Sequence, residues 1–301
     1  MIKTVTVVNH LGESLKMELT RPQTSGFYIE KIEGLGPSVA NVNVTERASI
    51  DGGYFSSAHV NTRNIVLTLG FWFDSGVEDM RHKSYRYFPL KKKITLIVET
   101  DKRICEAYGY VESNEPDIFS ERETAQISIL CPDPYFYANI DNTTTLSTVD
   151  PLFEFEFSNE SLVDPLIEFG NVLDEPGGTV HNSGDVDVGV TMTVCISGDV
   201  NNLSITNKTT GEVMNINSTT LVSLTGSDLH DTDEIIISTI RGSKSIRLLR
   251  DGSYTNIVNC LDRFTDWIQL VAGDNQFVID ADTGADLVSI TVENKIAYAG
   301  V

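Results

Sequence analysis

The sequence predicts a mainly β protein of two domains, and three observations lead to that fold class. Short runs of β-branched and aromatic residues alternate with polar ones along most of the chain, as they do in half-buried strands. Clusters of Gly, Asn and Asp separate these runs and have the composition of turns. The chain has 301 residues, more than the roughly 100–200 of an ordinary domain, so we expect two domains.

The first half is expected to contain a set of strands and one long hairpin. The strands are predicted at residues 2–8, 15–19, 26–33, 39–48, 63–73, 93–99, 103–111 and 124–130. Asp51, Gly52 and Gly53 have the composition of a hairpin tip. They predict a long hairpin with residues 39–48 and 63–73 as its arms, which either protrudes or is shared with another molecule.

A single helix is predicted over residues 75–88, where the alternation stops. Side chains that suit a buried stripe recur there at helical spacing, at Val77, Met80, Ser84 and Phe88. Ser75 and Glu78 have the spacing of a capping box, and Pro89 stops the helix. We expect the stripe to pack against a sheet.

The second half begins after a segment that cannot continue a strand. Pro132 and Pro134 interrupt the pattern and a polar stretch follows, which places a boundary near 135–150 and predicts domains 1–140 and 141–301. Strands resume at residues 152–157, 165–169, 178–181, 188–196, 202–207, 212–217, 234–238, 245–249, 256–260, 267–270, 275–280 and 286–292. Many short strands at this spacing predict a β-sandwich.

Charge and cysteine spacing exclude several classes of protein. With 22 Lys and Arg against 43 Asp and Glu, the net charge of −21 would repel the phosphates of nucleic acid, and most of the excess negative charge lies in residues 141–301.

The cysteines are too far apart for a zinc site or a disulfide scaffold, so we expect buried free thiols at Cys105, Cys131, Cys195 and Cys260. No apolar run approaches the ~18 residues of a membrane span and no leader pattern is present, so we expect synthesis in the cytoplasm and no membrane contact.

The sequence offers little catalytic chemistry, so we predict no enzyme activity and no cofactor. A Gly-rich phosphate loop, a zinc-binding helix and a nucleophile elbow are all absent, and the five histidines are scattered singly. Acidic pairs such as Asp231 with Asp233 are expected in solvated loops rather than beside a sugar bond. The run from Asp280 to Asp286 resembles half of a calcium loop, but Thr291 stands where a ligand glutamate is needed, so we expect a turn and no metal.

Several segments, taken in order, resemble the distal tail proteins (Dit) of bacteriophages with long tails, which form the hub at the tip of the tail tube. In the first half they are GLGP at 34–37, IDGGYF at 50–55, RNI at 63–65, AYGYV at 107–111 and LCPDPYF at 130–136. In the second half they are HNSGD at 181–185, ITNKTTGE at 205–212, Trp267 with Leu270, GDN at 273–275 and YAG at 298–300.

The resemblance implies a fold, an assembly and a set of partners. It implies an N-terminal β-sandwich-like domain with one helix and a long belt hairpin, followed by a galectin-like β-sandwich. It also implies a homo-hexameric ring in the virion, at the distal tail tip or baseplate, through whose lumen DNA passes without specific binding. The ring would contact the major tail tube protein, the tape-measure protein, the tail-associated lysin or fibre hub, and receptor-binding proteins.

The belt hairpin is expected to form the contact between neighbouring subunits. The residues assigned to this interface are Val39, Val42, Val44, Asp51, Gly52, Gly53, Tyr54, Phe55, Arg63 and Ile65. An alternative of a different class is a carbohydrate-binding module that contacts host cell-wall polysaccharide, with Tyr254 or Trp267 stacking on a sugar. A glycoside or cell-wall hydrolase is a third hypothesis, which no group of residues supports.

Overall fold

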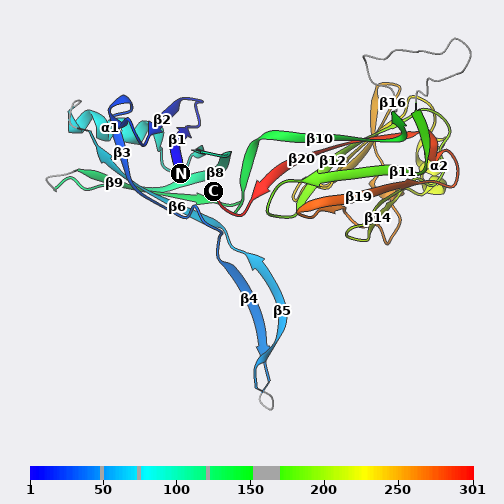
Figure 1. Cartoon of the computed structure of the whole chain (residues 1–301), viewed down its shortest axis with the longest axis horizontal. Helices are drawn as coiled ribbons and strands as arrows, with labels where there is room; N and C mark the ends of the chain where they lie inside the picture. Colours follow the sequence, from blue (N-terminus) through cyan, green and yellow to red (C-terminus); the bar gives the residue numbers. More distant parts are fainter. Residues whose placement is uncertain (48–50, 73–75, 120–122, 152–169) are drawn as a thin grey trace, which may run out of the picture. The chain divides into compact units, whose positions relative to one another are not determined.

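The structure is a computed structural model that describes residues 1–47, 51–72, 76–119, 123–151 and 170–301. The chain is mainly β, as predicted, and divides into two compact units (Figure 1). Unit 1 consists of Met1–Asn139 and Ala297–Val301, and unit 2 of Ile140–Ile296. The sequence placed the last five residues in the second domain. They belong to unit 1, where the Val301 amide donates a hydrogen bond to the Leu35 carbonyl oxygen at 3.0 Å.

Unit 1 is an antiparallel sheet around one apolar core. Its strands are β1 (Ile2–Val8), β2 (Ser14–Glu18), β3 (Phe27–Glu33), β6 (Arg63–Phe71), β7 (Lys93–Thr100), β8 (Ile104–Pro116) and β9 (Thr124–Cys131), with the 3-10 helix η1 (Pro22–Thr24) before β3. They pair in the order β2-β1-β7-β8-β9-β6-β3, and contacts between β2 and β3 bring the two edges together. Alternate residues point into the core, and Val5, Leu67 and Ile127 are fully buried there.

The helix α1 (Val77–Tyr87) lies close to its predicted range and packs on this core. Three residues of the predicted stripe are buried: Met80, Ser84 and Phe88. The N-cap residue is Gly76, where the sequence predicted Ser75. Ser75 itself lies outside the described residues.

The arms of the hairpin differ from the prediction. Residues 40–46 form β4 (Ala40–Glu46) as expected, but its partner is β5 (Gly53–Val60) and not residues 63–73. Residues 63–71 form β6, which pairs with β3 on one side and β9 on the other and buries alternate side chains in unit 1. The strand β5 was not predicted because Ser56, Ser57 and Ala58 pack poorly on a half-buried sheet and so have a low preference for strands.

Unit 2 contains two antiparallel ladders, and alternate residues are buried along their strands at 188–194, 234–238, 273–280 and 288–294, as in a two-layer β-sandwich. One ladder runs through β17 (Ser253–Asn256), β16 (Ser245–Arg250), β15 (Glu234–Ser238), β12 (Val188–Ile196) and β20 (Val288–Tyr298). The other runs through β14 (Glu212–Asn215), β13 (Ser204–Asn207), β19 (Gly273–Asp280), β11 (Gly170–Asn182) and β10 (Phe136–Pro151). The short strand β18 (Gln269–Leu270) pairs with β12.

The sequence prediction lacks a second helix, α2 (Ser218–Thr225). Its N-cap is Asn217, whose Oδ1 accepts a hydrogen bond from the Thr220 amide at 3.0 Å, and Gly226 ends it with a φ of +88°. These are ordinary start and stop signals, but Thr219 and Thr220 favour strands and hide the helix. Among the described residues, neither α1 nor α2 is long and apolar enough to cross a membrane.

Two further predictions for unit 2 are wrong, and two lie outside the described residues. Residues 256–260, expected in one strand, end β17 and then form the 3-10 helix η2 (Val258–Cys260); another, η3 (Ala285–Leu287), precedes β20. Cys195 is exposed, although the other three cysteines are buried as expected. The expected strands 152–157 and 165–169 lie outside the described residues.

Candidate functional site

Every residue of β4 and β5 is exposed. The two strands form a sheet of their own, and Figure 1 shows them side by side as a separate two-stranded ribbon. Several of these side chains are large and apolar: Val42 and Val44 are each 54% exposed and Phe55 is 68% exposed. Because soluble proteins rarely expose contiguous apolar side chains without a partner, this hairpin has the character of a binding surface.

The register of the two strands gives the hairpin an apolar face and a polar face. Directly opposite residues in a ladder point to the same side of the sheet, and successive residues point to opposite sides. One side carries Ala40 with Val60, Val42 with Ala58 and Val44 with Phe55, and we call it the apolar face; next to the tip the same side also carries Glu46 with Gly53. The other carries Asn41 with His59, Asn43 with Ser57 and Thr45 with Tyr54, and we call it the polar face.

A β-bulge produces this separation. The register shifts between Asn43 and Val44, because Asn43 lies opposite Ser57 while Val44 lies opposite Phe55, which leaves Ser56 as the extra residue. With a regular ladder, Val44 would lie opposite Ser56 and Phe55 would point to the polar side. The bulge therefore places the largest apolar side chain of β5 beside the valines of β4.

Backbone features mark the start of β5 and the root of the hairpin. Just before β5, Gly52 has a φ of +89°, a conformation that glycine adopts without strain, and a Cβ on Gly53 would lie 2.4 Å from Cγ1 of Val44, so a larger residue at 53 would displace that side chain. At the root the Asn61 amide donates to the Val39 carbonyl oxygen at 3.0 Å. This backbone hydrogen bond closes the hairpin at its root.

Two residues of the predicted interface do not lie on the hairpin. Arg63 and Ile65 begin β6, and their side chains are 2% and 0% exposed, inside unit 1. They are buried because β6 is a central strand whose odd-numbered residues point into the core. The other eight predicted residues lie on the hairpin or at its root and are exposed: Val39, Val42, Val44, Asp51, Gly52, Gly53, Tyr54 and Phe55. Ala40, Ala58 and Val60 also lie on the apolar face and were not predicted.

The two aromatic residues considered for sugar stacking lie on separate segments of unit 2. Tyr254 lies on β17 and is 58% exposed, with the Arg247 guanidinium 5.3 Å from its ring centre. Trp267 precedes β18 and is half-buried, with Nζ of Lys244 5.3 Å from its ring centre. Within the described residues no ring contact joins the two.

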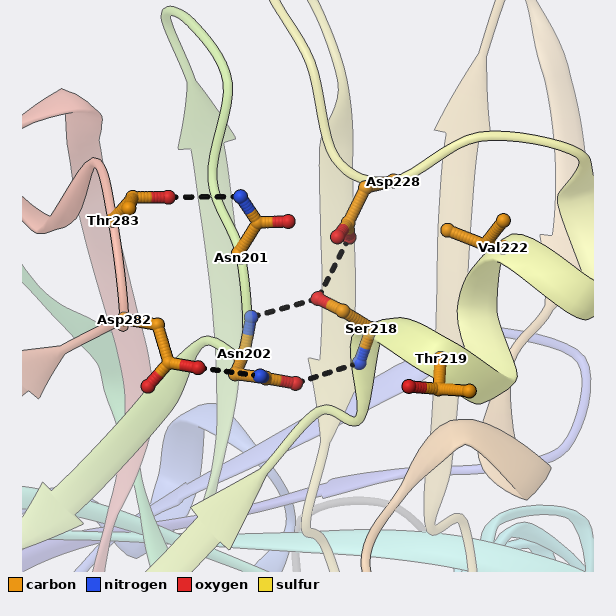
Figure 2. A pocket seen from close by; sticks show the side chains of 8 residues that line it. All are labelled: Asn201, Asn202, Ser218, Thr219, Val222, Asp228, Asp282 and Thr283. Atoms are coloured by element: carbon orange, nitrogen blue, oxygen red, sulfur yellow. Dashed lines mark hydrogen bonds between the residues drawn. The ribbon is translucent and has the colours of Figure 1, made fainter.

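Unit 2 also has a shallow polar depression between the start of α2 and the turn before β20 (Figure 2). Its polar groups bind one another. The backbone amide of Asn202 donates to Oγ of Ser218 at 2.7 Å, and the backbone amide of Ser218 donates to Oδ1 of Asn202 at 2.9 Å. Oγ of Ser218 in turn donates to Oδ1 of Asp228 at 2.9 Å. This network joins three segments of the unit and leaves few groups of the depression free for a ligand.

The acidic run after β19 is part of the same junction. Nδ2 of Asn202 donates to Oδ2 of Asp282 at 2.6 Å, Nδ2 of Asn201 donates to Oγ1 of Thr283 at 2.8 Å, and Gly284 turns the chain with a φ of +79°. In the part of the chain that the structure describes, no three or more His, Cys, Asp or Glu side chains are grouped so that they could hold a metal ion.

Comparison with known proteins identifies the fold. No protein-family model matches the sequence, and a search of curated proteins found no match. Among solved structures, the chain is similar to the Dit protein of phage SPP1, described as a paradigm of the hub of the adsorption apparatus in phages that infect Gram-positive bacteria. The identity is 15%, the TM-score is 0.63, and the match covers 97% of this chain and 99% of that one. A chain of the phage P2 baseplate in its activated conformation also matches, at 11% identity and a TM-score of 0.42, over 98% of each chain. The chain has the fold of SPP1 Dit over nearly its whole length.

Proposed function

We propose that this chain is a structural protein of a phage tail tip that assembles into a ring through its hairpin. Two observations support the proposal. The chain has the fold of SPP1 Dit, a hub protein, over 97% of its length. The observation that carries the proposal is the apolar face of the hairpin. This face is exposed in the single chain, and a bulge places Phe55 on the same side as Val42 and Val44.

A ring forms through head-to-tail contacts, so each copy needs two different surfaces: one that binds the next subunit and one to which the previous subunit binds. The hairpin suits the first role, because a two-stranded ribbon is only marginally stable alone and is stabilised when another subunit covers it. Full burial of one Val or Phe side chain contributes about 1.5–3 kcal/mol. Burial of Val42, Val44 and Phe55, which lie together on the apolar face, would therefore contribute a sizeable part of the free energy of association.

The proposed ring has six copies and acts by geometry rather than catalysis. It would lie in the virion at the distal end of the tail tube, between the tube and tape-measure proteins on one side and the lysin or fibre hub and receptor-binding proteins on the other. Each chain carries a net charge of −21, so a ring of such chains repels the phosphates of DNA. This property suits a channel through which DNA passes without binding.

The test replaces two neighbouring residues that point to opposite faces. Val44→Asp places a charge on the apolar face and Thr45→Asp places the same charge on the polar face, so the pair is matched in charge and position. We expect the wild-type chain and Thr45→Asp to give a mass near six chains by light scattering, with annular particles in negative-stain images. We expect Val44→Asp to give folded monomers, because a buried carboxylate without a partner is strongly unfavourable.

Two results would contradict the proposal. A Val44→Asp chain that still forms rings would show that the apolar face is not the contact. A wild-type chain that stays monomeric at every concentration, alone and with the purified tube protein, would show that the chain does not form a ring.

A further inference from the structure

Arg63 lies at the foot of the hairpin and is almost completely buried. It is the first residue of β6, three residues after β5 ends, and it is 2% exposed. Its guanidinium donates to four backbone carbonyl oxygens. Nε donates to Pro134 at 2.6 Å, Nη1 to Gly34 at 2.6 Å and to Gly36 at 2.5 Å, and Nη2 to Ala299 at 2.6 Å.

These bonds replace the carboxylate that a buried arginine usually has. Among the described residues no ion pair involves Arg63, and its guanidinium lies 4.4 Å from the centre of the Phe136 ring. Burial lowers the pKa of Arg63, but an arginine stays charged in proteins. A buried cation is costly unless its donors are satisfied, so the position of the four carbonyl groups is tied to this one side chain.

The four carbonyl groups come from three segments that are far apart in the sequence. Residues 34–36 connect β3 to the first arm of the hairpin, Pro134 lies in the turn before β10, and Ala299 belongs to the last five residues. Residues 34–36 lie directly against β6 and against the C-terminal residues. A Cβ on Gly34 would lie 2.1 Å from the Asn64 carbonyl oxygen, and a Cβ on Gly300 would lie 3.0 Å from the Leu35 carbonyl oxygen.

We propose that Arg63 is the positioning residue for the base of the hairpin: its guanidinium holds the entry to the hairpin, the turn before β10 and the C-terminal residues in one arrangement. The consequence for ring formation rests on the proposed function, but the positioning role does not. Arginine suits this role because its planar fork offers five donors in fixed directions, whereas lysine offers a single flexible ammonium group.

The first test measures amide hydrogen exchange in the Val44→Asp background, so that its result does not depend on a ring. Arg63→Gln removes the charge and most of the donors, Arg63→Lys keeps the charge without the fork, and Arg81→Gln is the control, since it removes a half-buried guanidinium of unit 1 that pairs with Glu123. We expect Arg63→Gln to raise exchange at least about tenfold in peptides that contain the amides of Asn61 and Val301, while β7 and β8 exchange as before. Arg63→Lys is expected to fall between Arg63→Gln and the parent.

The outcomes separate positioning from general stability. Exchange that rises equally in β7 and β8, or that stays unchanged at Asn61 and Val301, would overturn the proposal, and so would an Arg81→Gln chain that behaves like Arg63→Gln. If Arg63→Gln does not fold, Arg63→Lys and a chain that lacks residues 297–301 decide the question. Truncation should raise exchange at Asn61, because it removes the Ala299 carbonyl group and frees part of the guanidinium.

The second test concerns assembly. In the wild-type background we expect Arg63→Gln to lose the ring mass in light scattering and Arg63→Lys to recover part of it. If the wild-type chain forms no ring, the proposed function fails but the exchange result still stands. If the ring forms and Arg63→Gln leaves it unchanged while exchange rises at the root, the arginine positions the hairpin without any consequence for assembly.

Discussion

At the scale of single residues, two arginines are satisfied in opposite ways, and the difference predicts how each responds to substitution. Arg63 donates to carbonyl oxygens, whereas Arg250 meets a carboxylate. Nε of Arg250 donates to Oδ1 of Asp233 at 2.8 Å, and the Asp233 side chain is 1% exposed. The sequence favoured a solvated loop for Asp233, and this was wrong because the residue lies in a buried ion pair at the start of β15. The Asp233 hydrogen bond also raises the pKa of Arg250.

Replacing Asp233 by Asn should destabilise the protein by about 3 kcal/mol, the lower end of the range for a broken buried ion pair. The lower end applies because Arg250 is partly exposed and keeps its hydrogen bonds to Oγ of Ser227 (2.6 Å) and the Asp228 carbonyl oxygen (2.7 Å). Urea unfolding measures the change. The exposed neighbour Asp231→Asn is the control and should shift stability by less than about 0.5 kcal/mol; equal effects of the two substitutions would contradict the role of the pair.

Glu13 predicts a dependence on pH. Its pKa is lowered from 4.5 to about 2, first because Arg86 donates hydrogen bonds to the carboxylate and next because Asn9 does. A carboxyl whose pKa is lowered by folding stabilises the protein above its unfolded pKa, and this stabilisation is lost as the pH falls from 4.5 towards 2. In Glu13→Gln, urea unfolding should therefore show stability falling less steeply over this window than in the wild type. Parallel curves for the two proteins would mean that Arg86 and Asn9 do not lower this pKa.

At the scale of elements, long alternating runs were predictable and short irregular ones were not. The strands β1 and β12 occur at their predicted ranges, 2–8 and 188–196, because six of the seven residues of β1 are β-branched and apolar residues alternate along β12. The strand β5 was not predicted because its central residues, Ser-Ser-Ala, have a low preference for strands. It forms a strand because it pairs with β4. The helix α2 escaped because its two capping residues give a weaker signal than its threonines.

The capping of α2 can be tested directly. Asn217→Ala removes the oxygen that accepts from the Thr220 amide, so we expect a loss of about 1 kcal/mol in the free energy of unfolding. Thr219→Ala is the control, because Thr219 is exposed and alanine favours a helix, so stability should stay equal or rise slightly. Urea unfolding of both variants gives the comparison. An Asn217→Ala chain as stable as the wild type would show that the cap contributes nothing.

At the scale of the whole molecule, the position of the candidate site was predictable but its chemistry was not. Asp51, Gly52 and Gly53 marked the tip of the hairpin in the correct place. Which side chains share a face depends on the bulge at Ser56, and a shift of one residue has no signature in the sequence. The role of Arg63 was hidden for a different reason: its partners are carbonyl groups, which every residue carries, so their convergence exists only in the folded chain.

Charge and the apolar face together predict how salt affects assembly. Each chain carries a net charge of −21, so copies repel one another, and the repulsion reaches about 10 Å at 0.1 M salt but only about 3 Å at 1 M. The proposed contact is apolar and is not weakened by screening. Sodium chloride should therefore strengthen assembly, and sedimentation or light scattering over a salt series should show the dissociation constant falling as salt rises. Val44→Asp should stay monomeric throughout, because screening removes repulsion but does not restore the apolar contact. Rings that dissociate as salt rises would instead mean that ion pairs hold the copies together and that the apolar face is not the main contact.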